Sequence, residues 1–239
     1  PVTPKLGLQY QLNERSMIYS TASKGYRSGG VNVPVPQAIC GPGLALVGLT
    51  AAATPTTYGS DTVWSYEVGG KFRLFNNRLQ VNTSAFRIDW TDVQVNVTFP
   101  GCAPSFITNA AQARSQGFDL EAEARPFRNL TLGRAVGYND AHYTADATGP
   151  TPRNGAAPTL VLRKGDALPV PRWTVAVNAQ YGFNFIGGTQ AYIRGDYRFT
   201  SDYLRGFGPG VNSFAPDMIN AEAAQRVDAR FGVAFGSLD

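Results

Sequence analysis

The chain's single histidine, His142, follows Asp140 by two residues, and this pair could take part in general acid–base chemistry. A carboxylate that orients an imidazole is part of a hydrolase triad, which a nucleophilic serine would have to complete. No Gly-x-Ser-x-Gly elbow accompanies the pair. The alternation described below places both residues where a strand meets a long loop. We therefore interpret His142 as a loop-edge residue and predict no catalytic residues.

Cys40 and Cys102 are the two cysteines, and they lie in predicted loops on either side of one hairpin. One histidine and two distant cysteines give no metal-ligand spacing, so we expect neither a metal site nor a cofactor. Export to an oxidising compartment would make a Cys40–Cys102 disulfide the expected state. A free or metal-binding pair is the alternative.

Residues 63–97 show the pattern of the elements that would position these loops. Read with a period of two, one side of the first strand is apolar and aromatic, and the other side carries charges of both signs. A turn with two asparagines, which tolerate the left-handed conformation of a hairpin, separates it from a second long strand. The apolar side of the first strand consists of Trp64, Tyr66, Val68, Phe72 and Leu74.

The same alternation predicts about nine antiparallel strands along the chain. Their connections alternate between tight turns and long loops, among them residues 25–61 and 98–112, as in outer-membrane barrels, whereas the loops of soluble sandwiches do not alternate so regularly. Aromatic residues would also form two bands, because Trp64, Trp90 and Trp173 lie at the outer strand ends, and Phe75, Phe127, Phe183 and Phe185 lie at the inner turns. We therefore predict an all-β fold, a transmembrane antiparallel β-barrel with lipid outside and a wet lumen inside.

Two irregularities interrupt the alternation. The phase changes near Ala85 and Phe86, which we interpret as a β-bulge. Arg134 lies on the apolar side of its strand, for which the sequence gives no explanation. The charges on the inward side are expected to form a barrel wall in which opposite charges pair across strands.

The composition excludes several other classes. Net charge is +4, with acidic and basic residues interleaved, so no basic stripe points to nucleic acid. No apolar run is long enough for a membrane helix, and the start of the sequence does not resemble a signal peptide.

Three motifs resemble TonB-dependent outer-membrane receptors, in the order in which that family carries them. Residues 23–30, SKGYRSGG, resemble the family's SKGFRSGG stretch. Residues 66–69, YEVG, with Lys71, Phe86 and Gln94, resemble its YELGxK…F…Q hairpin. Residues 109–111 and 117–121 resemble its NAG…GVELE strand.

This resemblance implies a barrel of 22 strands that encloses an N-terminal plug in the Gram-negative outer membrane. Residues 1–239 would then be a segment of the barrel domain that lacks the plug, the TonB box, the early strands and the closing strands. The implied partners are outer-membrane lipid, the protein's own plug, the TonB complex through the N-terminal region, and a small ligand such as a metal chelate. The resemblance also implies that the outer loops and the upper lumen contact this ligand, and the candidates there are Tyr26, Arg27, Tyr58, Tyr203, Arg205, Phe207 and Phe214. Packing within the loop is the alternative role for each of them, and aromatic and arginine side chains suit a siderophore, a cobalamin or an oligosaccharide equally well. The implied function is TonB-energised uptake of a scarce ligand such as a ferric siderophore. The alternatives are a passive porin or structural barrel, and a hydrolase that acts through His142.

Overall fold

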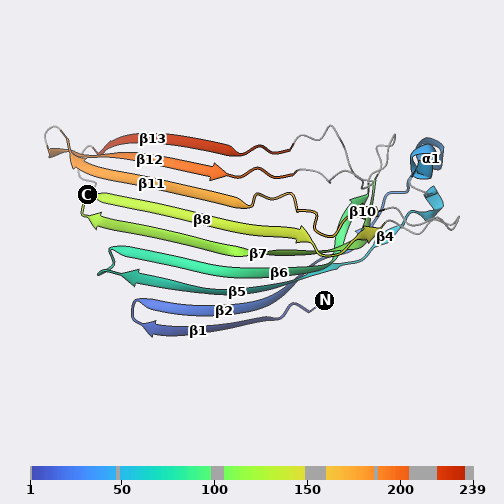
Figure 1. Cartoon of the computed structure of the whole chain (residues 1–239), viewed down its shortest axis with the longest axis horizontal. Helices are drawn as coiled ribbons and strands as arrows, with labels where there is room; N and C mark the ends of the chain where they lie inside the picture. The colour runs from blue at the N-terminus through green and yellow to red at the C-terminus, as the bar shows by residue number, and fades with distance from the viewer. Residues whose placement is uncertain are drawn as a thin grey trace.

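The computed structural model describes residues 2–46, 49–97, 105–148, 160–185, 188–204 and 220–234, and most of them form one nine-stranded antiparallel sheet. Each strand of this sheet pairs with the strand before it and the strand after it in the sequence, which confirms the predicted number and order (Figure 1). The strands are β1 (Lys5–Asn13), β2 (Ser16–Arg27), β5 (Asp61–Leu74), β6 (Leu79–Val97), β7 (Phe106–Phe127), β8 (Leu130–Tyr143), β11 (Trp173–Asn184), β12 (Gln190–Thr200) and β13 (Ala224–Ala234).

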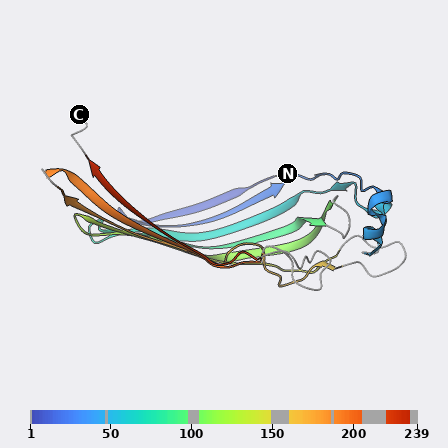
Figure 2. The same ribbon diagram turned by 90° about the horizontal axis from the view of Figure 1, so that it is seen from above.

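The sheet is a single curved layer, and Figure 2 shows it from above as a shallow trough. The edge strands β1 and β13 each pair with one neighbour only, so the described sheet does not close on itself. Tight turns join the strands at one end, and the long connections gather at the other (Figure 1). The first of these ends is called the turn end below, and the second the loop end.

The register shows which side chains share a face, because residues directly opposite each other in an antiparallel pair point to the same side. Opposite one another lie Leu8, Ser20, Val68, Ala85, Phe118, Tyr138 and Trp173, each on a successive strand. We call this side the exterior face, and the side that carries Glu67, Glu121 and Asp196 the lumen face. The exterior face leaves large apolar side chains open, with Leu8 68% and Val227 75% exposed. This is the pattern of a barrel whose exterior contacts lipid.

The predicted turn between β5 and β6 is confirmed. Phe75, Asn76 and Asn77 have φ angles of 51°, 55° and 66°, which lie in the left-handed region. Asparagine adopts this conformation more readily than most residues, so the two asparagines let the chain reverse within four residues.

The loop end contains more regular structure than the sequence predicts. The region expected to be a loop, residues 25–61, includes β3 (Gly30–Val31), α1 (Gln37–Leu46), η1 (Ala51–Ala53) and β4 (Thr57–Tyr58). The helix forms although it contains Pro42, because Cys40 and Leu44 are completely buried and tertiary packing outweighs helix propensity. Among the described residues, no helix is long and apolar enough to cross a membrane.

The segment before the fifth strand of the sheet was also predicted to be a loop as far as residue 112, and this is wrong. β7 already begins at Phe106, and two further short strands, β9 (Ala147–Thr148) and β10 (Leu160–Leu162), pair nearby. Phe106 and Leu162 are 1% and 0% exposed and belong to one hydrophobic cluster at the loop end. This cluster, which we call the loop cap, joins the connections to β6, β7 and β8.

The bulge predicted near Ala85 is wrong. The pairing of β5 with β6 is continuous from Leu74↔Leu79 to Thr62↔Thr91, and the register of β6 changes only in its pairing with β7, between Trp90 and Gln94. The break in the alternation near Ala85 therefore reflects a change in the types of side chain on the two faces of the strand, and not a shift in strand register. Arg87 and Asp89 lie on the exterior face, and Trp90 lies on the lumen face, so Trp90 is not part of an exterior aromatic band.

The charge pairing predicted across strands is confirmed only in part, by a diagonal ion pair between Arg230 and Asp196. Arg194 lies directly opposite Arg230, and Asp196 lies opposite Asp228. The ion pairs run along the strands instead, from Arg194 to Asp196 at 2.7 Å and from Arg226 to Asp228 at 2.9 Å. A diagonal contact of 3.8 Å joins Arg230 to Asp196. Because the sign of the charge alternates along each strand, ion pairs within a strand compensate the like charges that face each other on neighbouring strands.

Candidate functional site at the loop end

Asp61, the first residue of β5, lies at the centre of the contacts that fix the loop end. It is 1% exposed, and its register partner Arg27 donates to its carboxylate from Nε at 2.9 Å. The backbone N–H of Gln94 donates to the same carboxylate at 3.3 Å. The Arg27 guanidinium also lies 4.6 Å from the centre of the Trp90 ring, within cation–π distance. This group of residues is called the Asp61 anchor below.

The pKa of Asp61 reflects two opposing effects. Burial raises this pKa, but the hydrogen bonds from Arg27 and from the Gln94 backbone, with the Arg27 charge, outweigh burial and hold the pKa below its ordinary value. Asp61 lies on the loop side of Trp64, beyond the part of the strand that faces lipid. The carboxylate is therefore charged and paired at neutral pH.

Acid is expected to loosen the Asp61 anchor. Because the folded-state pKa of Asp61 lies below the unfolded value of about 3.9, the pair stabilises the fold above that pH and stops doing so as pH falls through the folded pKa. Hydrogen exchange of residues 28–60, corrected for the intrinsic rate, should stay level from pH 7 to pH 5 and rise below about pH 4. In Asp61→Asn this acid step should be absent, and an equal step in the variant would contradict the assignment.

Three amide side chains hold the first long connection to the strands. Asn32 donates to the Ile107 carbonyl at 2.8 Å and accepts from the Ile107 N–H at 2.8 Å. Asn109 accepts from the Gly59 N–H at 2.6 Å and donates to the Asp92 carbonyl at 2.8 Å. Gln94 donates from its side chain to the carbonyls of Ser28, at 2.9 Å, and Gly59, at 3.1 Å. Backbone groups that loops leave unpaired are satisfied in this way.

Sequence reasoning found only part of this arrangement. Gln94 and Asn109 stood out through the resemblance to the receptor family, whereas Asn32 and Asp61 did not stand out at all. The missing signal is burial: a carboxylate in an ordinary strand pattern becomes an anchor only when a distant loop covers it.

The structure places four of the seven predicted ligand-binding residues. Arg27 belongs to the Asp61 anchor, and Tyr26 lies opposite Thr62 on the exterior side of β2, 41% exposed. Tyr58 lies in β4 opposite Gly30 and is half-buried. Tyr203 pairs with Ala221 through two backbone hydrogen bonds of 3.0 Å. Arg205, Phe207 and Phe214 lie outside the described residues.

Tyr203 also lines a pocket at the rim of the sheet. This pocket has a volume of about 320 Å³, and Arg172, Trp173, Asp202 and Asn220 are among its other lining residues. It combines an aromatic wall with both signs of charge, and its size is at the lower end of the range for small-molecule sites. Arg27 lies in β2 whereas Tyr203 follows β12, and the structure does not bring the two residues into contact.

One of the two cysteines of the predicted disulfide lies outside the residues that the structure describes. Cys40 is completely buried and is not a free thiol. Cys102 lies outside the described residues, so its pairing with Cys40 stays a prediction. Among the residues that the structure describes, no group of three or more His, Cys, Asp or Glu side chains could hold a metal ion.

His142 lies at the loop end of β8, as predicted. Its Nδ1 is 3.4 Å from the Asp140 carboxylate, and Arg172 approaches the same carboxylate at 3.6 Å. Both residues are opposite exterior-face residues of β7, with His142 opposite Arg114 and Asp140 opposite Gln116. The pair therefore points away from the lumen, and the Arg172 guanidinium beside the Asp140 carboxylate suits an ion-pair cluster better than a hydrolase base.

Comparison with known proteins agrees with this geometry. A curated relative, the metal-pseudopaline receptor CntO of Pseudomonas aeruginosa, is 28% identical over 144 residues, which cover 60% of this chain and 17% of CntO. The chain therefore spans about a sixth of the length of that relative.

Solved structures of longer proteins share the fold. The ferric yersiniabactin uptake receptor FyuA of Yersinia pestis aligns with a TM-score of 0.67 at 17% identity, over 95% of this chain and 29% of FyuA. The ferric preacinetobactin receptor BauA of Acinetobacter baumannii aligns with a TM-score of 0.60 at 14% identity, over 96% of this chain and 29% of BauA. The model of the TonB dependent receptor-like β-barrel matches residues 1–236. The chain therefore belongs to the TonB-dependent receptor β-barrel family, whose members are Gram-negative outer-membrane proteins.

Proposed function

We propose that the complete protein that carries this chain imports a metal chelate across the outer membrane, with energy from the TonB complex. The chain would be a segment of the barrel domain, and the plug and the TonB-contacting region would lie elsewhere in the protein. Three relatives whose names identify a cargo, CntO, FyuA and BauA, are receptors for metal or ferric chelates, which supports this choice among scarce ligands.

The observation that carries the proposal is the combination of a charged lumen face with a loop end that is fixed in place. Asn32, Gln94 and Asn109 attach the long first connection to β6 and β7, so it forms a built surface above the lumen. A surface that hydrogen bonds hold in place loses less conformational entropy when a ligand binds than a mobile loop would, which raises affinity. A non-selective pore would not require such a surface.

We assign ligand contact to the rim pocket and to neighbouring loop residues. Tyr203 and Arg172 offer a ring face and a guanidinium, which suit the anionic oxygen donors that chelators present to hard metal ions. Tyr58 is a second candidate, on the first connection. Arg27 is already engaged by Asp61 and Trp90, so its contribution would be indirect, through the position of the loop.

Binding of metal chelates to the purified complete receptor tests this proposal. Titration with the metal–pseudopaline complex and with ferric yersiniabactin, followed by intrinsic fluorescence, is expected to give a Kd below about 1 µM for at least one of them, or about −8 kcal/mol. The metal-free chelators should bind at least about tenfold more weakly. Tyr203→Ala should weaken binding, whereas Tyr181→Ala on the exterior face should not. Binding of neither complex, together with binding of a cobalamin or an oligosaccharide, would overturn the proposal.

A further inference from the structure

The exterior face carries a group of charged side chains in an otherwise apolar surface. Lys24, Trp64, Asp89, Arg114 and His142 lie directly opposite one another on five successive strands. The row next to it toward the turn end contains Arg87, Gln116 and Asp140. Charged side chains on the lipid side of a barrel are tolerated near the membrane interfaces and disfavoured at the midplane. Their concentration here requires an explanation.

Cations outnumber carboxylates in this group. Arg87 and Arg114 both donate to Asp89, with Nε–carboxylate distances of 2.8 and 2.7 Å. Arg172 and His142 approach Asp140, and Lys24 lies 6.0 Å from the centre of the Trp64 ring. Four cations, Lys24, Arg87, Arg114 and Arg172, therefore face two carboxylates. We call these six residues and His142 the exterior charged patch.

The arginines keep donors available for a further partner. In the described part of the chain, Arg114 donates a hydrogen bond only through Nε, which leaves both terminal amino groups unused. Arg87 uses Nε and one terminal nitrogen on Asp89, and its side chain is 50% exposed. Guanidinium groups with free terminal nitrogens bind phosphate oxygens in a fixed geometry, frequently through two bonds.

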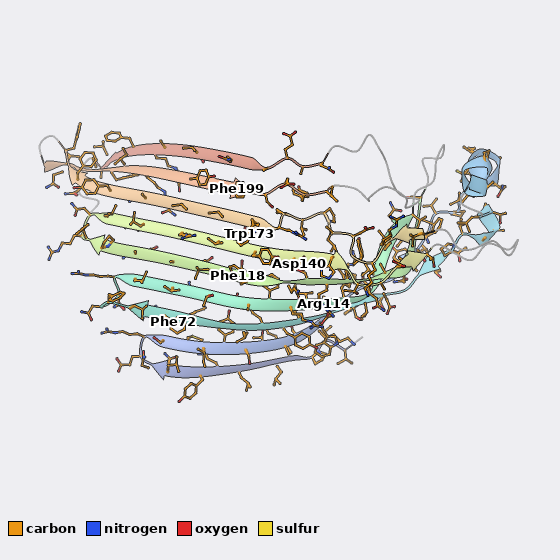
Figure 3. The ribbon with its side chains drawn as sticks, in the orientation of Figure 1. Phe72, Arg114, Phe118, Asp140, Trp173 and Phe199 are labelled. Atoms are coloured by element: carbon orange, nitrogen blue, oxygen red, sulfur yellow. The ribbon has the colours of Figure 1, made fainter. Side chains whose placement is uncertain are left out.

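Aromatic residues show at which depth of the membrane the patch lies. Trp64 and Tyr66 stack on one side of it, with ring centres 6.0 Å apart. Phe118, Tyr138 and Trp173 form a ring cluster on the other side, with Tyr138 and Trp173 4.7 Å apart. In Figure 3, Arg114 and Asp140 lie closer to the loop end than Phe118 and Trp173 do. Tryptophan and tyrosine rings gather at the level of the lipid headgroups, so the patch lies at that level in the outer leaflet.

An apolar groove begins at the same place. Its volume is about 490 Å³, and Leu8, Ser20, Ala22, Val68 and Ala85 contribute to its walls, with Arg87 beside them. Small side chains on β2 and β6 leave the hollow between the larger ones on β1 and β5. A groove of this kind on the lipid side of the sheet accommodates a hydrocarbon chain, and Arg87 links it to the exterior charged patch.

We propose that the exterior charged patch and this groove together bind one phosphate-bearing lipid of the outer leaflet. Its phosphate would lie between Arg87, Arg114 and Lys24, and one acyl chain would follow the groove toward the turn end. The surplus of cations, the unused guanidinium donors and the adjoining groove all favour an anionic lipid over a zwitterionic one. The three cations that would hold the phosphate do not line the rim pocket, although Arg172 of the exterior charged patch does, and this proposal does not depend on the proposed transport function.

Native mass spectrometry of the complete receptor in detergent, with lipid A that carries two phosphates as the probe, tests this inference. The unaltered receptor should retain one lipid A, and Arg87→Gln/Arg114→Gln should bind it at least tenfold more weakly. Arg134→Gln is the matched control, because Arg134 lies on the same face opposite Ala122 and Val177, closer to the turn end. Inorganic phosphate at 1 mM should not displace the lipid, since it cannot fill the groove.

A second variant keeps the test decisive if the double variant does not fold. Ala85→Leu fills the groove with an apolar side chain that suits a lipid-facing strand, and it leaves every charge in place. It should also weaken lipid A binding at least tenfold. Unchanged binding in the folded variants, equal weakening in Arg134→Gln, or displacement by inorganic phosphate would each overturn the proposal.

Discussion

Replacement of Gly117 by alanine is expected to prevent the barrel from assembling stably. Gly117 lies on the lumen face of β7, and a Cβ at this position would overlap the backbone carbonyl oxygen of Tyr138 and lie 3.1 Å from the Phe86 ring. The carbonyl belongs to the neighbouring strand and cannot move without breaking the β7–β8 ladder. Overpacking usually costs about 1–3 kcal/mol, and a clash with fixed backbone belongs at or above the upper end of that range.

The heat-modifiable migration of the complete receptor in denaturing gels is a suitable measurement, because a folded barrel migrates differently from an unfolded one. Gly117→Ala should lose most of the folded band. Gly195→Ala is the matched control: this glycine also lies in a central strand of the described sheet, and a Cβ there would meet no atom within 4 Å. A folded band of equal intensity in both variants would show that the close approach at Gly117 is not required.

Replacement of Arg27 by glutamine is expected to release the first long connection. The change leaves the Asp61 carboxylate buried without its cation, and the cost is expected to be about 3 kcal/mol, the lower end for a buried pair, because the Arg27 side chain is itself 51% exposed. Hydrogen exchange at the amides of Asn32 and Gly59, which are bonded to Thr56 and Asn109, should accelerate about 100-fold or more. The strands near the turn end should exchange as before.

Two controls separate burial of charge from loss of an ion pair. Arg226→Gln breaks a lumen pair with Asp228 in which the two side chains are 71% and 32% exposed, so it should leave hydrogen exchange close to that of the unaltered protein. Arg27→Gln/Asp61→Asn removes both charges and should recover part of the lost protection, because no unpaired charge remains buried. Equal exchange in the single and the double variant would contradict the role given to Asp61.

The sheet could be predicted from the sequence because the features that define its strands and turns depend on residues close together in the chain. Alternation with a period of two follows from the pleat, and it identified the apolar face of β5 and the charged face of β7. The asparagines at 76 and 77 likewise identified their turn, since left-handed backbone selects residue type. These features need no knowledge of distant segments.

The predictions that the structure contradicts concern features that depend on long-range packing or on the environment of one face of the sheet. α1 and the start of β7 form because Leu44 and Phe106 are buried in the loop cap, which no periodicity reveals. Phe86, Ile88 and Trp90 share a side and suggested a bulge, because the lipid-facing side was assumed to be the apolar one along the whole strand. The register shows instead that this face becomes polar near the loop end. Arg194 and Asp196 form an ion pair along one strand, whereas the prediction considered only pairs between neighbouring strands.

Accumulation of a radioactive metal chelate by whole cells tests the central claim most directly. Cells with the complete gene should accumulate ⁵⁵Fe from its ferric chelate at nanomolar concentration. Cells without the gene, and cells whose proton gradient has been collapsed, should bind the chelate at most at the surface. Energised transport predicts that accumulation is lost both when the gene is absent and when the proton gradient is collapsed. Gene-dependent accumulation that continues at the same rate after the gradient has been collapsed would contradict it and would indicate a passive pore.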